Sequence, residues 1–225
     1  MTPLMNTFRR RLLASGCAVA LAHLAGCVAR PVWKGDDGTA YGLLNRSTIA
    51  LIAMTDPARR PDVASALHDA RAVFIFPDAT AMGLVAGDAA RSGLVLVRDP
   101  AGGGWTGPAF CALDGGGRWL EASFKGKGLL IVVLSDEHVP RLFDGGSAID
   151  AKASRPSVDL DILVFSQAPG TVAGSLVGAG SIHARDALND AYYGQPASPE
   201  EILHKRVAGN PSAAELQDVL ARASR

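Results

Sequence analysis

The stretch Leu129-Leu130-Ile131-Val132-Val133-Leu134 decides the fold, because six consecutive apolar residues predict a strand buried in the interior. A second run, Ala72-Val73-Phe74-Ile75-Phe76, has the same character and ends at Pro77. We expect the first run to be a central strand of a sheet. Further strands are predicted over 83–87, 93–97, 105–113, 118–124, 159–166 and 172–182, with Gly-rich turns at 99–104 and 114–117.

Helical patterns stand at both ends of this strand-rich centre. Residues 43–54 are apolar along much of one face and predict a helix that stops near Asp56-Pro57. Asp62 is placed to cap a second short helix that runs through Ala70. The C-terminal signals are a helix over 186–193 closed by Gly194, a capping box at 198–201 and the same signature at 212–215. Strands do not alternate with helices, so the chain predicts an α+β fold with a mostly antiparallel sheet.

The N-terminus has the organisation of a secretory signal. Arg9-Arg10-Arg11 precedes an apolar run of 13 residues, Leu12 to Leu24, which is too short to span a bilayer of about 30 Å as a helix. Leu24-Ala25-Gly26-Cys27 follows and resembles the bacterial lipobox, in which the thiol receives the lipid. We therefore expect a signal peptide over 1–26 and a fatty-acylated Cys27. Ordinary signal cleavage, with Cys27 as a bystander, is the alternative.

Residue 28 indicates in which membrane the protein is anchored, and the net charge of the chain indicates which partners it can bind. Val28 stands where an Asp is associated with inner-membrane retention, so we expect an outer-membrane anchor facing the periplasm. The whole chain has a net charge of zero, which argues against a nucleic-acid binder built on bulk positive charge. Three Cys residues exclude a zinc ribbon and a multi-disulfide scaffold. Cys111 is expected to be a small buried strand residue.

The order of several segments resembles the SYLF domain family of lipid-binding domains, whose bacterial members are often lipoproteins. The matching segments are ARAVFIFP (70–77), GLVLVR (93–98), WTGPAF (105–110), LLIVVL (129–134), VFSQ (164–167), AGSL (173–176) and NDAYYG (189–194). The resemblance covers roughly residues 43–205, which we expect to form a SYLF-like domain. The Pro, Gly and Asp residues before it predict a lipidated tether over 27–42, and the capping signature at 212–215 predicts a C-terminal helix within 206–225. The resemblance implies binding of phospholipid membranes, with phosphoinositides as ligands of eukaryotic members and actin as a partner of fungal ones.

Candidate membrane contacts are basic and aromatic side chains at predicted turns. Lys125 and Lys127 alternate with glycines between two strands, and each Lys near an anionic surface adds about 1 kcal/mol to binding. Arg59 and Arg60 stand at another turn, and Trp105 and Trp119 follow Gly-rich turns. Core packing of the Trp residues and ordinary solvation of the Lys pair are the alternatives. If the Lys pair is ordinary surface, the apolar helix from Leu43 to Met54 is the next place to seek a binding face.

Motifs for catalysis and metal binding are weak. The five His residues form no H-x-x-x-H pair, and Gly174-Ser175-Leu176-Val177-Gly178 places Ser one residue too early for a nucleophile elbow. Asp159 and Asp161 would share one side of a strand, which is typical of a solvated face more often than of a cation site. We expect a non-enzymatic protein without metal or cofactor, with an anionic phospholipid surface as partner. The alternative is a structural lipoprotein that binds an envelope protein.

Overall fold

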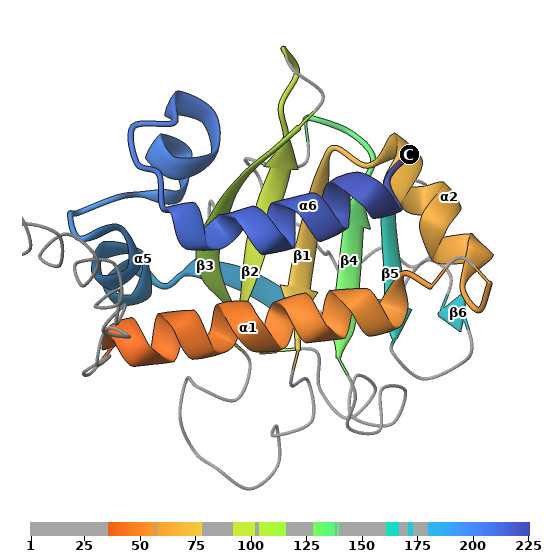
Figure 1. The fold of residues 1–225 in the computed structure, drawn as a ribbon, viewed down its shortest axis with the longest axis horizontal. Coiled ribbons are helices and arrows are strands. Elements are labelled where there is room, and N and C mark those ends of the chain that lie inside the picture. Colours follow the sequence, from red (N-terminus) through yellow and green to blue (C-terminus); the bar gives the residue numbers. More distant parts are fainter. Residues whose placement is uncertain are drawn as a thin grey trace, which may run out of the picture. The chain divides into compact units, whose positions relative to one another are not determined.

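The computed structural model describes residues 36–56, 58–77, 92–101, 104–115, 128–137, 139, 161–166, 171–172 and 180–225. All of the described residues belong to one compact unit within residues 34–225. The helices are α1 (Asp36–Met54), α2 (Pro61–Asp69), α5 (Asp186–Tyr193), the π-helix η2 (Glu201–Lys205), the 3-10 helix η3 (Pro211–Ala213) and α6 (Ala214–Ala223) (Figure 1). The strands are β1 (Ala72–Phe76), β2 (Ser92–Arg98), β3 (Trp105–Gly115), β4 (Leu129–Val133), β5 (Ile162–Ser166), β6 (Thr171–Val172) and β7 (Gly180–Ala184).

The strands form one seven-stranded sheet in the order β6-β5-β4-β1-β2-β3-β7. Every described neighbouring pair is antiparallel, and Phe74 of β1 lies opposite Val95 of β2 and Ile131 of β4. The α+β class and the antiparallel sheet predicted from the sequence are confirmed. The two apolar runs that suggested this fold, β1 and β4, are neighbours in the interior of the sheet, and β1 occupies its middle position.

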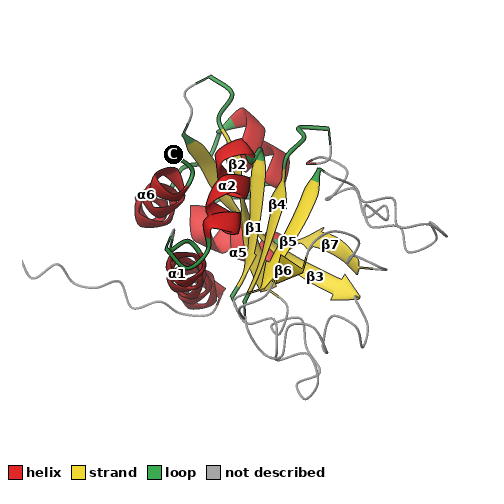
Figure 2. Cartoon of the chain, turned by 90° about the vertical axis from the view of Figure 1, so that its right-hand side faces the viewer, coloured by secondary structure: helices red, strands yellow, loops and turns green. Residues whose placement is uncertain are grey.

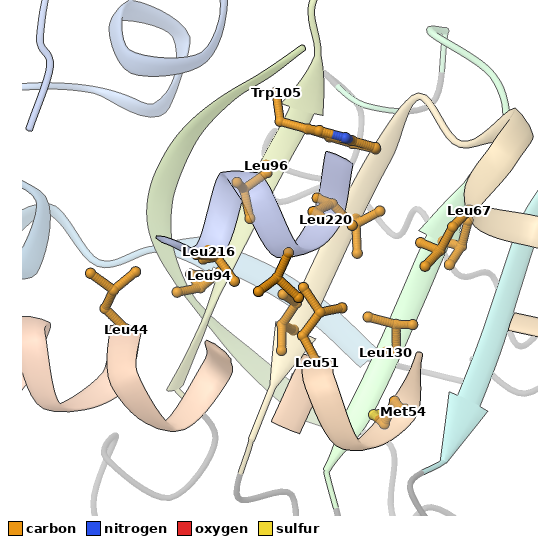
Figure 3. Close-up of a cluster of buried hydrophobic side chains, with 14 of the residues drawn as sticks. Leu44, Leu51, Met54, Leu67, Leu94, Leu96, Trp105, Leu130, Leu216 and Leu220 are labelled. Carbon is orange, nitrogen blue, oxygen red and sulfur yellow. The ribbon is translucent and has the colours of Figure 1, made fainter. Parts of the chain in front are cut away.

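Both faces of the sheet are apolar, because successive side chains of a strand point to opposite faces. Val73 and Ile75 belong to the core cluster that includes α1, α2, α5 and α6, and these helices lie on one side of the sheet (Figure 2). Phe74 and Phe76 belong to a second cluster, with Ile202 and other residues. Figure 3 shows the helical side, where Leu side chains of α1, α6, β2 and β4 converge. The continuous apolar runs are thus explained by burial on two sides.

The predicted single strand over 172–182 is wrong. Its ends belong to β6 and β7, which lie at opposite edges of the sheet. β7 pairs with β3 so that Leu113 lies opposite Ile182 and Gly115 opposite Gly180. This pairing also carries β3 to Gly115, into the turn predicted over 114–117. Strand pairing of this kind is non-local, so local apolar pattern could not reveal it. The strands predicted over 83–87 and 118–124 lie outside the described residues.

Helix α1 begins at Asp36, seven residues before the predicted start and within the segment predicted as a tether. Its early turns are already part of the core, because Ala40 and Leu43 are almost fully buried. Asp36 and Asp37 are acidic, which suits the positive N-terminal end of a helix dipole. Gly38 and Gly42 are poor helix formers, so the sequence predicts a later start than the structure shows.

Two of the predicted caps are wrong and two are confirmed. Arg60, not Asp62, occupies the N-cap position of α2, and Asp62 lies in the first turn. Asn210, not Ser212, caps the last helical segment, because its side chain accepts a hydrogen bond from the Ser212 backbone N–H at 3.0 Å. The capping box is present, with Ser198 N–H donating to the Glu201 carboxylate at 2.9 Å. Gly194 closes α5 in the left-handed conformation, with φ of 70°.

Buried polar contacts fix α5 against β3. The Asn189 side chain is fully buried and accepts a hydrogen bond from the Phe110 backbone N–H at 2.7 Å. It also donates to the Phe110 carbonyl at 3.4 Å, and the Tyr193 hydroxyl donates to the Pro108 carbonyl at 2.8 Å. A buried amide with both of its groups satisfied stabilises a unique packing arrangement. The burial of these polar groups is therefore explained by the packing of α5 on β3.

Candidate functional site

The structure describes three of the seven candidate site residues. These are Arg59, Arg60 and Trp105. The lipidation candidate Cys27, the loop residues Lys125 and Lys127, and Trp119 lie outside the described residues, so their roles stay predictions. The three described side chains have different surroundings.

Trp105 is not a surface residue, so its prediction as a membrane contact is wrong. It is only 6% exposed and belongs to the core cluster on the helical side of the sheet. Its indole N–H donates to the Ser224 hydroxyl at 3.4 Å, and the Arg98 guanidinium lies 4.7 Å from the ring centroid. Trp105 opens β3 beneath α6, so the tertiary fold covers the side chain that follows the exposed turn (Figure 3). The alternative of core packing is confirmed.

The Arg98 guanidinium that stacks on Trp105 is itself held by backbone carbonyl groups. It donates to the Ala70 carbonyl at 2.7 Å and to the Leu67 carbonyl at 2.8 Å, close to the C-terminal end of α2. A cation there stabilises the negative end of a helix. Burial, with the nearby Arg71, lowers the pKa of Arg98. Arg98 therefore joins the C-terminal end of α2 to strand β2 of the sheet.

Arg60 is also unsuited to bind a headgroup. Its side chain is 11% exposed and makes two hydrogen bonds to the Asp62 carboxylate, each 3.1 Å long. It donates a third to the Ser166 carbonyl at 2.8 Å and lies over the Phe165 ring. The hydrogen bonds from Arg60 lower the pKa of Asp62. Arg60 therefore joins the start of α2 to the end of β5, and its prediction as a lipid contact is wrong.

Arg59 is the candidate that the structure leaves accessible. Its side chain is 84% exposed, and its closest acidic partner is Asp56 at 3.4 Å, which is itself well exposed. Exposed ion pairs of this kind contribute between about zero and 1 kcal/mol, so the guanidinium can exchange Asp56 for another anion. Arg59 lies in the short turn between α1 and α2. Arg59 therefore lies close in sequence to the C-terminal end of α1.

The outer face of α1 carries exposed apolar side chains. Of the described residues, Ile49, Ile52 and Val207 are the exposed large hydrophobic side chains, at 59%, 51% and 58%. Ile49 and Ile52 are three residues apart, so they lie on the same side of the helix. Asn45, Arg46 and Ala53 are exposed with them. We call these five residues the α1 outer face. It lies opposite the side of α1 that packs on the sheet.

The α1 outer face carries both apolar and basic side chains. Arg46 precedes Ile49 by three residues, and Arg59 follows the helix after Asp56. A methyl group at Gly42 would lie 3.4 Å from the Arg46 guanidinium, so the Arg46 side chain extends back along the helix toward Gly42. The exposed isoleucines Ile49 and Ile52 thus stand between two basic residues in the sequence, Arg46 and Arg59. The sequence indicates the helix from Leu43 to Met54 as the second place for a binding face but does not single out Ile49 and Ile52.

Three side chains of the described residues, Cys111, Tyr192 and Tyr193, have pKa values that burial raises. Cys111 is a free, fully buried thiol on β3, as predicted, and burial raises its pKa. Burial also raises the pKa values of Tyr192 and Tyr193, whose rings pack edge to face. Across the described ranges, no group of three or more His, Cys, Asp or Glu residues is placed to hold a metal ion. Asp161 is described and exposed, whereas Asp159 lies outside those ranges.

None of the helices that the structure describes has both the length and the apolar character needed to cross a bilayer.

The fold defines an α+β domain with a helical layer on one face of an antiparallel sheet. A family model described as Ysc84, the Las17-binding protein actin regulator, matches residues 142–223. The Ysc84 model describes the SYLF type of domain, and its match confirms the resemblance over residues 142–223. The resemblance of the earlier segments stays a prediction. No curated protein matches the chain.

Proposed function

We propose that this protein is a bacterial envelope lipoprotein whose SYLF-like domain contacts phospholipid membranes and does not catalyse a reaction. The observation that carries the proposal is Leu24-Ala25-Gly26-Cys27 directly after a short apolar run with a basic start. An acylated Cys27 would hold the domain at a membrane, and Val28 favours the periplasmic side of the outer membrane.

The α1 outer face supports a direct membrane contact by the domain. Ile49 and Ile52 leave apolar surface in water, and its burial in the interfacial region of a bilayer is favourable by roughly 25 cal/mol per Å². Arg59, in the turn that follows α1, adds an exposed positive charge. The Lys125 and Lys127 pair stays a further candidate on sequence grounds. The expected ligand is an anionic phospholipid surface.

A second candidate function is recognition of an envelope protein. The family description names a Las17-binding protein, so a member of this family binds a protein partner. An exposed pair of isoleucines with basic neighbours also suits an acidic protein surface. The domain would then be a structural or protein-interaction module held in place by its lipid.

The lipid anchor is tested by metabolic labelling of wild type and Cys27→Ser with an alkyne fatty acid. We expect label on the wild type and none on the variant, because the thiol is the acylated group. Cys111→Ser is the matched control and should be labelled like the wild type, since its thiol is buried. Equal labelling of Cys27→Ser and wild type would overturn the proposal.

A further inference from the structure

Only half of the outer edge of β3 is paired with a strand. β7 pairs with β3 from Cys111 to Gly115, and β2 lies on the other side of β3. In the part of the chain that the structure describes, no strand pairs with residues 105–110 on the β7 side. A strand edge without a partner presents N–H and C=O groups that can pair with another chain. The groups that contact this half of β3 therefore determine whether the sheet can be extended there.

The ladder between β3 and β7 ends at Arg185, where the chain passes from β7 into α5. The Arg185 backbone N–H donates to the Phe110 carbonyl at 3.0 Å, which continues the ladder by one bond. In an antiparallel pair of this type the two residues exchange both bonds, so the Arg185 carbonyl would accept from the Phe110 N–H. That carbonyl instead accepts from the N–H groups of Leu188 and Asn189, at 2.9 and 3.0 Å, in the first turn of α5. The start of the helix therefore takes up the backbone acceptor that the Phe110 N–H would have used.

The Asn189 side chain supplies the acceptor in its place. It is fully buried, and its Oδ1 accepts from the Phe110 backbone N–H at 2.7 Å while its Nδ2 donates to the Phe110 carbonyl at 3.4 Å. These are the two bonds that a residue of a neighbouring strand would exchange with Phe110. An amide side chain can make both because it carries a donor and an acceptor on one planar group. Asn189 therefore takes the place of a strand residue.

Two further side chains occupy carbonyl groups earlier in β3. The Pro108 carbonyl accepts from the Tyr193 hydroxyl at 2.8 Å, and proline has no N–H to offer a new strand. The Gly107 carbonyl accepts from the Gln217 side chain at 2.8 Å. We call Asn189, Tyr193 and Gln217 the β3 edge cap. Its members come from α5 and α6, so helices satisfy the half of the strand edge that β7 does not reach.

We propose that the β3 edge cap closes the sheet against strand addition by a second copy of the chain, and that Asn189 is its decisive member. Asn189 occupies the Phe110 N–H, whereas Tyr193 and Gln217 occupy carbonyl groups only. Residues 105–110 carry no charged side chain that would oppose pairing between two copies. The side chains of the cap are therefore the barrier to pairing. This role is independent of lipid binding and of the lipid anchor.

The test uses the full-length chain in a nonionic detergent over a series of protein concentrations. Sedimentation velocity reports association, and hydrogen exchange of the Phe110 backbone amide, followed by NMR, reports the state of the strand edge. Asn189→Leu removes both hydrogen bonds at similar side-chain size. Leu51→Ala is the control for a general loss of stability, because Leu51 is fully buried on α1 and its loss leaves the amide in place. Tyr193→Phe is the control within the cap.

We expect Asn189→Leu to exchange the Phe110 amide about five- to 150-fold faster than wild type at low concentration, since a buried N–H has lost its acceptor. At higher concentration it should associate, and protection of the Phe110 amide should return in the associated species. Wild type, Leu51→Ala and Tyr193→Phe should stay monomeric, the last because Pro108 offers no N–H.

An Asn189→Leu chain that is folded and monomeric at every concentration would overturn the proposal. Equal association of Leu51→Ala would also overturn it, because loss of stability and not an open edge would then be the cause. Association of Tyr193→Phe to the extent of Asn189→Leu would contradict the decisive role of Asn189. If Asn189→Leu does not fold, Asn189→Ser replaces it, since it lacks the paired amide and is smaller than the buried side chain. The same outcomes then decide.

Discussion

Helix α1 has two sides with different roles, although both carry large apolar side chains. Leu51 and Met54 on the inner side are buried against the sheet, whereas Ile49 and Ile52 on the outer side are more than half exposed. The inner side contributes to the stability of the fold. The outer side contributes little to stability and is therefore available for a ligand. The difference shows that residue type alone does not separate core from binding surface.

Trp105 gives the sharpest contrast to the outer isoleucines, because it was a candidate contact and lies in the core. Trp105→Ala should destabilise the domain by about 3 to 5 kcal/mol, from lost burial and the cavity left behind. It should not weaken vesicle binding of the molecules that stay folded. Chemical denaturation and vesicle sedimentation measure the two effects. A stable Trp105→Ala variant that has lost vesicle binding would reverse the assignment.

A matched pair within α1 tests its two sides directly. Leu51→Ala should cost about 2 to 5 kcal/mol in the free energy of unfolding, because Leu51 is fully buried. Ile52→Ala should change the same quantity by less than about 0.5 kcal/mol, apart from a small propensity gain. Urea titrations of both variants provide the comparison. Similar losses in the two variants would mean that the outer side is covered in solution.

The loop lysines offer a competing binding surface. Lys125→Glu with Lys127→Glu should weaken binding to anionic vesicles by roughly 2 kcal/mol or more, at about 1 kcal/mol per Lys. Rising salt should reduce wild-type binding more than that of the variant, since exposed charges are screened over about 10 Å at 0.1 M. Vesicle sedimentation across a salt series measures this. Unchanged binding would assign the loop to ordinary surface and leave α1 as the contact.

The turn after α1 contains a pH-dependent contact with a small expected effect. The hydrogen bonds from Arg60 hold the pKa of Asp62 below its usual 3.8, so the folded state favours the carboxylate. Its contribution is present above pH 3.8 and is lost as the pH falls through the lower folded pKa.

Asp62→Asn should therefore lower stability at neutral pH by about 0.5 kcal/mol, the range of a solvent-accessible pair. The difference from wild type should disappear in strong acid. Urea unfolding at several pH values measures it. A difference that stays constant down to strong acid would show that the loss is one of packing and not of charge.

The interior of the sheet was predictable because local signals were strong there. β1 and β4 are continuous apolar runs, and α5 has a Gly at its end that takes the left-handed conformation. The edges were not predictable in the same way. Separating β6 from β7 requires knowledge of which strand each one pairs with, and residues 172–182 carry no local signal of that choice.

The candidate site was less predictable than the fold, because exposure is a tertiary property. Trp105 and Arg60 follow or occupy turns, yet α6 and the end of β5 supply the groups that enclose them. Ile49 and Ile52 stand on the opposite side of a helix from Leu43, Leu51 and Met54, which periodicity alone reveals. A helix that is apolar on most sides can be buried on all of them or exposed on one. The elements that pack around the helix decide which of the two occurs.

The central claim is that the domain itself contacts anionic phospholipid, and the most direct measurement is vesicle sedimentation of residues 28–225 without the anchor. We predict that this chain pellets with phosphatidylglycerol-containing vesicles and less with phosphatidylcholine vesicles. Ile49→Gln with Ile52→Gln should remain in the supernatant, whereas the control Val207→Gln should pellet like the wild type. Wild-type chain that stays in solution with every vesicle, but captures an envelope protein, would contradict the claim and support the protein-binding alternative.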